Sequence, residues 1–452
     1  MHIIIAGDGM VGSTLARQLC AGGHDVTLVD RDSTVLSKSV ETFDAMGICG
    51  NCASMETLVQ AGVKDAELLI AVTNSDEVNL LCCTVAHGLN PKLHAIARIR
   101  NPEYTEQAFK LRNIFGLSLA INPDRQAALE IERLLKYPGF LKRDSFAKGR
   151  TEIVELRISE DSKLRNVALI DMYSIVKCKV LVCAVIREGQ CITPRGDFIL
   201  QEGDRIFVTA PAENLTTLLQ NLGILTRRVR RCLICGGSRV AYHLASFLEK
   251  HRISVTIIEN DLERCRSLTA QLPGINVIHG DGNDQSLLES EGLGEVDALV
   301  SLTGSDEMNM IISLYAQTRN VPQVITKLRR IENREIIDAL SLGSVVSPKE
   351  MCSNTIARYV RAMQNQVGAA VSVHSIADGQ AEASEFIVDG STRFCNTPLK
   401  DIKLKPGVLL VSITRGTRTE IPSGMSTFRK GDTVVVVTSS QNVLYQLNDI
   451  FA

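Results

Sequence analysis

A glycine triplet close to the start of the chain has the residue types and spacing of a phosphate-binding turn. An apolar run typical of a buried parallel strand precedes it, a helical run follows it, and the segment between them reads Gly7-Asp8-Gly9-Met10-Val11-Gly12. Gly7 would make the sharp bend, Gly9 would let a pyrophosphate approach the backbone, and Gly12 would let the helix lie close to the strand. The helix N-terminus would offer free N–H groups and a positive dipole end. The pattern predicts a dinucleotide-binding site.

An acidic residue refines the expected ligand. Asp30 closes the next apolar run, Val26–Asp30, at the spacing expected for a ribose-binding carboxylate. A carboxylate there accepts hydrogen bonds from both ribose hydroxyls and repels a 2′-phosphate, which favours NAD(H) or an adenine nucleotide over NADP. Arg31 beside it leaves two interpretations open: tolerance of a 2′-phosphate, or a solvated loop residue.

Polar residues also follow two later apolar runs, and parallel strands open their carboxyl ends into one crevice. Thr73 and Asn74 come after Leu68–Val72, and Asn74 with Glu77 three residues later predicts a capping box at the start of a helix. Arg98 ends the following run, and alternation places Arg98 and Arg100 on one face. We expect this face to contact a phosphate, an adenine or a partner, unless both arginines belong to an ordinary solvated strand end.

The chain repeats itself with a period of about 229 residues. Gly236 lies 229 residues after Gly7, Glu259 lies 229 after Asp30, and the later motifs and the small β-rich modules recur in the same order. Alternating helices and strands with this repeat predict an α/β fold: two Rossmann-like, doubly wound parallel-sheet domains, each followed by a small α+β domain. The expected boundaries are 1–125 and 226–350 for the Rossmann-like domains, 126–150 for a crossover helix and linker, 351–370 for a second crossover helix, and 151–225 and 371–452 for the small domains.

The second glycine turn departs from the pattern. It reads Gly236-Gly-Ser238-Arg239, so Ser238 puts a side chain where the backbone should touch a pyrophosphate. Glu259 can still bind ribose hydroxyls, and Arg239 could grip an anion with its guanidinium. The alternative is a surface arginine on a degenerate copy. We expect an adenine nucleotide here, with a preference different from that of the first site.

Composition excludes several classes of protein. The chain has 452 residues, 45% of them hydrophobic and 22% charged, with a net charge of −2 and an aromatic content of 4% without tryptophan. These values disfavour broad nucleic-acid binding and base stacking. Neither an apolar run of ~18 residues nor a signal peptide is seen, which indicates a soluble cytoplasmic protein.

The thirteen cysteines are scattered through apolar stretches and indicate reduced core residues. Cys49-Gly-Asn-Cys52 matches C-x-x-C, which would fit a redox pair or half of a metal site. No second pair stands near it, so we expect the loop to face a nucleotide and predict no metal.

Nothing in the sequence supplies a catalytic set. A dehydrogenase needs a proton donor and a substrate pocket beside the nicotinamide, whereas the eight histidines are dispersed and the small modules carry no recurring reactive residue. We therefore favour a binding protein over an enzyme. An NAD-dependent oxidoreductase and a nucleotide-binding scaffold with another partner are the alternatives.

The order of the first glycine turn, Asp30, Gly50-Asn51, Thr73-Asn74 and Arg98, followed by a small β-rich module and then repeated, resembles the regulator-of-potassium-conductance (RCK) family in its tandem form. The resemblance covers the whole chain and implies a homotetrameric cytoplasmic ring that is peripheral to the membrane, docks on a Trk-type potassium channel and gates it in response to NAD(H), ATP or ADP. The family's ligand residues would fall on Gly7, Asp8, Gly9, Met10, Val11, Asp30, Asn51, Thr73, Asn74 and Arg98.

Overall fold

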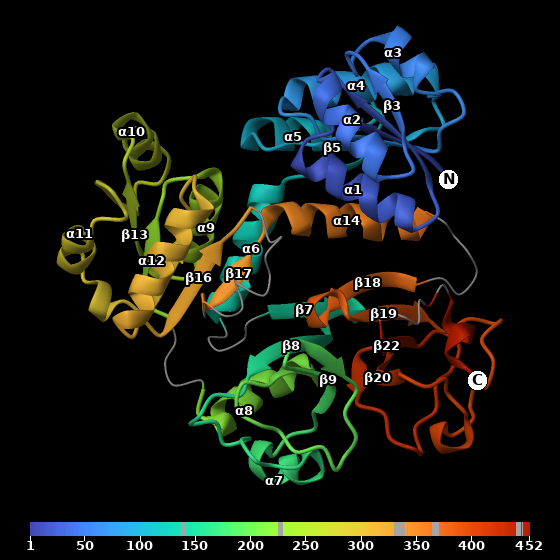
Figure 1. Ribbon diagram of the computed structural model, residues 1–452, viewed down its shortest axis with the longest axis vertical. Helices are drawn as coiled ribbons and strands as arrows, with labels where there is room; N and C mark the ends of the chain where they lie inside the picture. Colours follow the sequence, from blue (N-terminus) through green and yellow to red (C-terminus); the bar gives the residue numbers. More distant parts are fainter. Residues whose placement is uncertain are drawn as a thin grey trace. The chain divides into compact units, whose positions relative to one another are not determined.

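The computed structural model describes residues 1–136, 142–224, 229–329, 340, 342–363, 370–439, 444 and 446–452 (Figure 1). It forms two compact units, one of Met1–Leu129 with Ser347–Ala357 and the other of Glu130–Val346 with Arg358–Ala452. Parts of two predicted segments lie outside the described residues: 137–141 of the crossover helix and linker predicted at 126–150, and 364–369 of the crossover helix predicted at 351–370. The predicted boundary at 225 lies outside them too.

The first unit is built on a parallel sheet of six strands in the order β3-β2-β1-β4-β5-β6. The central strands are apolar runs buried on both faces, as expected for a sheet covered by helices on each side. The strands are β1 (His2–Ala6), β2 (Asp25–Asp30), β3 (Met46–Cys49), β4 (Leu68–Ala71), β5 (His94–Arg98) and β6 (Leu117–Ile121). The connecting helices are α1 (Met10–Ala21), α2 (Ser33–Thr42), α3 (Met55–Gln60), α4 (Asp76–Leu89) and α5 (Pro102–Lys110).

The first parts of two long helices, up to Leu129 and Ala357, complete the first unit. Helix α6 (Pro123–Lys136) begins directly after β6, and helix α14 (Pro348–Met363) comes from the second half of the chain. The side chain of Gln126 on α6 donates a hydrogen bond to Thr355 Oγ1 on α14 over 3.3 Å. Helix α14 begins 225 residues after α6, so the equivalent helices of the two repeats meet, with Gln126 in the first turn of α6 and Thr355 one turn further along α14.

The second unit contains a parallel sheet of the same order, β14-β13-β12-β15-β16-β17. Its strands are β12 (Arg231–Cys235), β13 (Ser254–Glu259), β14 (Asn276–His279), β15 (Ala298–Ser301), β16 (Gln323–Lys327) and β17 (Ser344–Val346). Its helices are α9 (Arg239–Lys250), α10 (Leu262–Gln271), α11 (Gln285–Ser290), η3 (Leu293–Glu295) and α12 (Asp306–Thr318).

Two antiparallel sheets of five strands form the small domains, in the orders β10-β9-β11-β8-β7 and β18-β19-β22-β20-β21. The first has β7 (Lys142–Phe146), β8 (Thr151–Arg157), β9 (Leu181–Arg187), β10 (Gln190–Ile192) and β11 (Arg205–Pro211), with η1 (Ala147–Gly149), η2 (Leu169–Asp171), α7 (Met172–Val176) and α8 (Ala212–Leu222). The second has β18 (Ala370–Ile376), β19 (Ala381–Ile387), β20 (Val408–Arg415), β21 (Arg418–Glu420) and β22 (Thr433–Ser439), with η4 (Ala377–Gly379), η5 (Leu399–Asp401) and η6 (Leu447–Ile450).

The two small domains share one hydrophobic core, to which β7, β8, β9 and β11 contribute from one sheet and β18, β19, β20 and β22 from the other. Their polar contacts are reciprocal. Arg150 donates to the carbonyl of Gly416, and Gln380, its counterpart in the repeat, donates to the carbonyl of Gly189 over 2.8 Å. Reciprocal contacts are the mark of a two-fold interface, here formed within a single chain. The four sheets and their repeat confirm the predicted fold class.

Candidate functional site

The turn between β1 and α1 is an open backbone cradle. Gly7 has a φ of +101°, and a Cβ on it would lie 2.9 Å from the backbone of Thr73. A Cβ on Gly12 would lie 1.9 Å from the carbonyl oxygen of Gly7, so the helix touches the strand at this point. Gly9 is different, because it is exposed, caps α1 without a side-chain hydrogen bond and has nothing within 4 Å of its Cβ position. The first N–H groups of α1 therefore stay available to an anion.

The other two residues of the turn face in different directions. Met10 is exposed at 48%, and Val11 is buried in the core. Any contact of Val11 with a ligand would therefore use its backbone.

Asp30 lies beside this turn and is held there by the backbone. Its Oδ2 accepts a hydrogen bond of 2.6 Å from the N–H of Asp8, and its Oδ1 accepts one of 3.0 Å from Asp32. Arg31 donates to Oδ1 of Asn51 over 2.8 Å, so the ends of β2 and β3 are tied together. The structure thus places Asp30 next to the turn and Asn51 one strand further along.

Asp8 is a buried carboxyl group in the turn itself. Burial, together with the negative charge of Asp30, raises its pKa to about 6, although a hydrogen bond of 3.0 Å from the Ser39 hydroxyl opposes the shift. Its Oδ2 is buried without a partner in the part of the chain that the structure describes. Ionised Asp8 is therefore unfavourable in the folded protein and would also repel a bound phosphate.

We expect the Asp8→Asn substitution to change how the free energy of unfolding depends on pH. Because the folded pKa lies above the ordinary value, the stability contributed by protonated Asp8 is present below about pH 4 and is lost as the pH rises through about 6. Denaturant unfolding at pH 5 and pH 7.5 should show the wild type losing about 1 kcal/mol relative to the variant over this interval, with water in the adjacent site screening part of the shift. Parallel curves for the two proteins would contradict the expectation.

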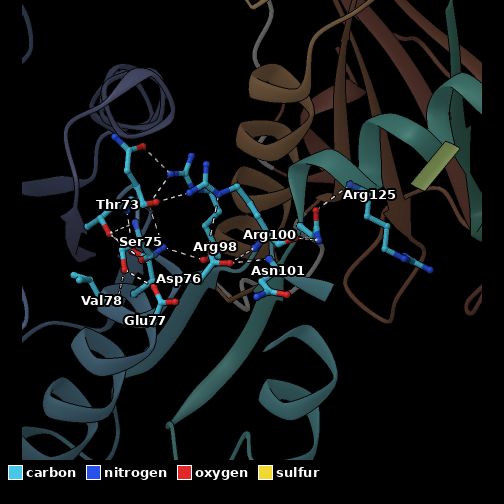
Figure 2. Close-up of polar contacts among 12 residues, drawn as sticks. Thr73, Ser75, Asp76, Glu77, Val78, Arg98, Arg100, Asn101 and Arg125 are labelled. Carbon is cyan, nitrogen blue, oxygen red and sulfur yellow. Dashed lines mark hydrogen bonds and ion pairs between the residues drawn. The ribbon is translucent and has the colours of Figure 1, made fainter. Parts of the chain in front are cut away.

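A buried amide organises the end of β4. Asn79 Oδ1 accepts hydrogen bonds from the N–H and the hydroxyl of Thr73 over 2.8 and 2.7 Å, and its Nδ2 donates to the carbonyl of Arg98 over 2.9 Å. Asn79 is fully buried, so this bridge joins the ends of β4 and β5 rigidly. Arg98 in turn donates to the carbonyl of Thr73 over 2.5 Å and to Asn74 Oδ1 over 3.2 Å (Figure 2).

The guanidinium of Arg98 is mostly committed to this turn. Burial and the neighbouring charge of Arg100 lower its pKa, and its Nε is buried without a hydrogen-bond partner among the described residues. That nitrogen is a donor available to a ligand oxygen.

Asp76 and Arg100 extend the network toward α6 (Figure 2). Asp76 Oδ2 accepts hydrogen bonds from the N–H groups of Arg100 and Asn101 over 2.8 and 2.7 Å, and Arg100 donates to the carbonyl of Asn74. The carbonyl of Arg100 accepts from Asn122, whose Oδ1 accepts from the N–H of Arg125 at the start of α6. Asp76 was not predicted as a site residue, although its position two residues after Asn74 could have indicated that it belongs to the site.

The predicted capping box on Asn74 is wrong by one residue. Helix α4 is capped by Ser75, whose hydroxyl oxygen accepts a hydrogen bond of 3.1 Å from Val78 and which donates to Glu77 over 2.6 Å. Helix α4 begins at Asp76, so Ser75 occupies the N-cap position, and the side chain of Asn74 instead accepts a hydrogen bond from Arg98.

The turn between β12 and α9 has the same backbone geometry as the turn between β1 and α1, but side chains occupy more of the space around it. Glu259 Oε2 accepts a hydrogen bond of 2.5 Å from the N–H of Gly237, as Asp30 does from Asp8. A Cβ on Gly237 would lie 2.9 Å from that oxygen, so the longer Glu259 takes the room that a side chain there would need. Arg264 donates to the carbonyl of Gly237 over 2.6 Å, and Ala241 stands in the third glycine position.

In the second copy, the side chain of Ser238 lies in the turn that corresponds to the phosphate turn of the first. It caps α9, and its hydroxyl oxygen accepts a long hydrogen bond of 3.5 Å from Ala241. Arg239 is exposed at the first position of the helix. Lys327 stands at the position of Arg98 and donates from Nζ to the carbonyl of Leu302 over 3.0 Å. A ligand in this copy would meet a serine hydroxyl in place of an open backbone.

Family models match both halves of the chain. The TrkA-N domain matches residues 3–123 and 232–348, and the TrkA-C domain matches residues 153–223 and 383–451. The chain belongs to the TrkA family. It is 32% identical over 96% of its length to the Trk system potassium uptake protein TrkA homolog of Archaeoglobus fulgidus, covering 97% of that protein. It is 31% identical over its full length to the Trk system potassium uptake protein TrkA of Haemophilus influenzae, covering 98% of that protein.

Solved structures share the TrkA fold at low identity. The RCK domain of GsuK superposes with a TM-score of 0.62 at 16% identity, covering 97% of this chain and 92% of that one. The GsuK channel bound to NAD gives a TM-score of 0.60 at 17% identity, covering 97% and 77%. The fold is therefore that of tandem RCK domains. Among the described residues, no helix is long and apolar enough to cross a membrane, and no cluster of three or more His, Cys, Asp or Glu side chains could hold a metal ion.

Proposed function

We propose that this member of the TrkA family is a regulatory subunit that binds NAD(H) or an adenine nucleotide at the turn between β1 and α1 and thereby controls a Trk-type potassium channel in the membrane. The observation that carries the proposal is the open turn at Gly9, with Asp30 held beside it. The predicted residues of the first site lie at the carboxyl ends of five neighbouring strands, β3-β2-β1-β4-β5, and at the start of α1. They are Gly7, Asp8, Gly9, Met10, Val11, Gly12, Asp30, Asn51, Thr73, Asn74 and Arg98. A protein of the same fold has been solved with NAD.

The hydrogen bonds beyond the site give it a route to the rest of the protein. Arg98 and Arg100 contact the turn at Thr73 and Asn74, and Asn122 connects Arg100 to the start of α6. A ligand that moves this turn would therefore act on α6, and through Gln126 on α14. Such a ligand shifts the equilibrium between two arrangements by its difference in affinity for them.

The proposal also covers the oligomeric state of the protein and its location in the cell. We propose a homotetramer at the cytoplasmic face of the membrane, held there by its channel partner; this part rests on the family resemblance. We propose no catalytic activity. The charged and amide side chains around the site form hydrogen bonds with backbone groups, so we assign them to positioning the turn rather than to chemistry; they are Arg98, Arg100, Asp76 and Asn79. ATP and ADP join NAD(H) as candidate ligands, and the second copy, with Ser238, Arg239 and Glu259, should differ from the first in its preference.

The test is nucleotide binding and potassium flux with an Asp30→Asn variant. The amide keeps the shape but loses the charge that favours ribose hydroxyls, so the affinity for NADH at the first site should fall about tenfold or more. Isothermal titration measures the affinity, and flux into vesicles holding the channel partner measures the nucleotide dependence. Glu259→Gln is the matched control in the second copy and should leave the first affinity unchanged. Unaltered nucleotide dependence in Asp30→Asn would remove this site from the mechanism.

The oxidoreductase alternative has its own readout. Turnover of NADH bound to the purified protein with small-molecule substrates would appear as a loss of nicotinamide absorbance. Sustained turnover would overturn the regulatory proposal.

A further inference from the structure

Asp8 places a buried carboxyl group between two glycines of the first phosphate turn. The residue is 1% exposed, and its Oδ2 is buried without a hydrogen-bond partner among the described residues. Its Oδ1 accepts a hydrogen bond of 3.0 Å from the hydroxyl of Ser39 on α2. A carboxylate that is removed from water needs several donors to replace its hydration, so this site suits the neutral acid better than the anion.

The charged group that faces Asp8 from the neighbouring strand is another carboxylate. Asp30 at the end of β2 accepts a hydrogen bond of 2.6 Å from the backbone N–H of Asp8, and its charge opposes ionisation of the Asp8 side chain. The group that faces Asp8 from α2 is the neutral hydroxyl of Ser39. In the part of the chain that the structure describes, no lysine, arginine or histidine forms an ion pair with Asp8. Ionisation of Asp8 therefore puts two like charges side by side.

We propose that the first site takes up a proton on Asp8 when it binds a pyrophosphate, so that nucleotide binding at this turn responds to pH. This inference rests on the proposed function and adds a second signal to it. A fall in pH would strengthen nucleotide binding, and a rise in pH would weaken it.

The charge of the ligand drives the proton uptake. Gly9 directly follows Asp8 and caps α1, so a pyrophosphate on the first N–H groups of α1 lies beside the turn that contains Asp8. Its negative charges repel an ionised Asp8 and do not repel the neutral acid. Burial raises the pKa of Asp8 to about 6, so most of the free protein carries an ionised Asp8 at neutral pH. A proton from the solvent removes the repulsion when the ligand binds.

The sign of the pH effect follows from linkage. A ligand that raises the pKa of a group binds the protonated form more tightly, so its affinity falls as the pH rises above the pKa of the free protein. A nearby charge shifts a carboxyl pKa by about one unit or more. We therefore expect the affinity for NAD⁺ at the first site to fall about tenfold between about pH 5 and pH 8.

The second copy of the turn lacks this carboxyl group. Gly237 stands at the position of Asp8, and a Cβ there would lie 2.9 Å from Oε2 of Glu259 and 2.7 Å from Cδ1 of Leu268. The backbone N–H of Gly237 still donates to the acid at the end of β13, as that of Asp8 does to the acid at the end of β2. The turn therefore forms without a carboxyl group at this position, and the architecture does not require Asp8.

The experiment is isothermal titration of the full-length protein with NAD⁺ between about pH 5 and pH 8, in pairs of buffers with different ionisation enthalpies. The pyrophosphate of NAD⁺ stays ionised over this range, unlike the terminal phosphates of ADP and ATP. Gly9→Ala fills the open turn, so the binding event that it removes is the first site. We expect that event to take up about half a proton per nucleotide near pH 6.5. Asp8→Asn removes the titrating group, so its affinity should no longer vary with pH and its proton uptake should vanish.

A second pair of variants tests the same proton from outside the turn. Ser39→Ala removes a hydrogen bond that favours ionised Asp8, so the fall in affinity should move to higher pH by about one unit. Ser37→Ala is the matched control on α2, because the exposed hydroxyl of Ser37 donates to the carbonyl of Ser33 over 2.8 Å. This control should leave the pH profile unchanged. A merely structural role of Asp8 would leave the profile unmoved in both serine variants.

The results separate this inference from the proposed function. Equal pH dependence in the wild type and Asp8→Asn, or an unmoved profile in Ser39→Ala, would refute proton uptake on Asp8 and leave the nucleotide site in place. A wild-type protein that binds no NAD⁺, NADH or ADP at any pH would refute the proposed function and this inference with it. Ser39→Ala keeps Asp8 in the turn, so its profile decides the question even if Asp8→Asn does not fold.

Discussion

Replacing Gly9 by alanine is expected to abolish nucleotide binding at the first site while leaving the fold intact. The Cβ position of Gly9 is open, with no protein atom within 4 Å, so the protein itself loses nothing by the substitution. A pyrophosphate on the N–H groups of α1 must approach within hydrogen-bond distance of the backbone, and the added methyl group would occupy that space. We expect the affinity for NADH to fall by about a hundredfold, measured by titration, because several charge-assisted hydrogen bonds are lost together.

Gly88→Ala is the matched control for this variant. Gly88 lies inside α4, is exposed and also has nothing within 4 Å of its Cβ position, so alanine there should stabilise the helix by about 0.5–1 kcal/mol and leave NADH binding unchanged. Equal thermal stability of Gly9→Ala and the wild type, with binding lost, would confirm that the open space serves a ligand. Undiminished NADH affinity in Gly9→Ala would show that no phosphate approaches this turn.

The sequence predicts those parts of the site whose residues lie close together along the chain. The glycine turn, its flanking strand and helix, and Asp30 follow one another within 30 residues, so their geometry depends on backbone conformation near each residue. The tandem fold was also predictable, because the two halves of the chain carry the same motifs in the same order.

Contacts between distant residues were beyond that reasoning. Asn74 was predicted to cap α4, but the helix begins one residue later with Ser75 as its cap, and Asn74 accepts a hydrogen bond from Arg98, 24 residues later. Cys52 was considered with Cys49 because they are close in sequence, whereas the structure buries Cys52 in the hydrophobic core of the domain and leaves Cys49 exposed. In both cases the outcome depends on residues that other strands and helices of the domain bring close, and spacing along the chain does not reveal them.

The second copy shows how small changes redirect a conserved geometry. Glu259 makes the same backbone contact as Asp30 with a side chain longer by one methylene group, and Gly237 replaces Asp8 where a Cβ would meet Glu259. The two substitutions therefore compensate each other. Ser238 caps α9 with its side chain, where Gly9 caps α1 without one. We therefore expect Ser238 to change which ligand the second turn prefers.

Gly7→Ala should cause the largest loss of stability of any single substitution argued for this protein. The φ of +101° is unfavourable for any residue with a Cβ, and that Cβ would lie 2.9 Å from the backbone N and Cα of Thr73. Backbone atoms of a central strand end cannot move aside as a side chain can, so the strain adds to the conformational cost. We expect the first parallel-sheet domain to lose about 3 kcal/mol of unfolding free energy.

Hydrogen exchange of the full chain can localise this loss. Peptides from β1 and β4 should exchange faster in Gly7→Ala, while those from β12 and β15, their counterparts in the second half, should keep the wild-type rate. Gly23→Ala is the control, because Gly23 has a φ of +74° but nothing within 4 Å of its Cβ position, and it should cost only about 1 kcal/mol. Equal losses in the two variants would mean that the close approach of Gly7 to Thr73 contributes nothing, and that conformation alone requires glycine at the start of the nucleotide turn.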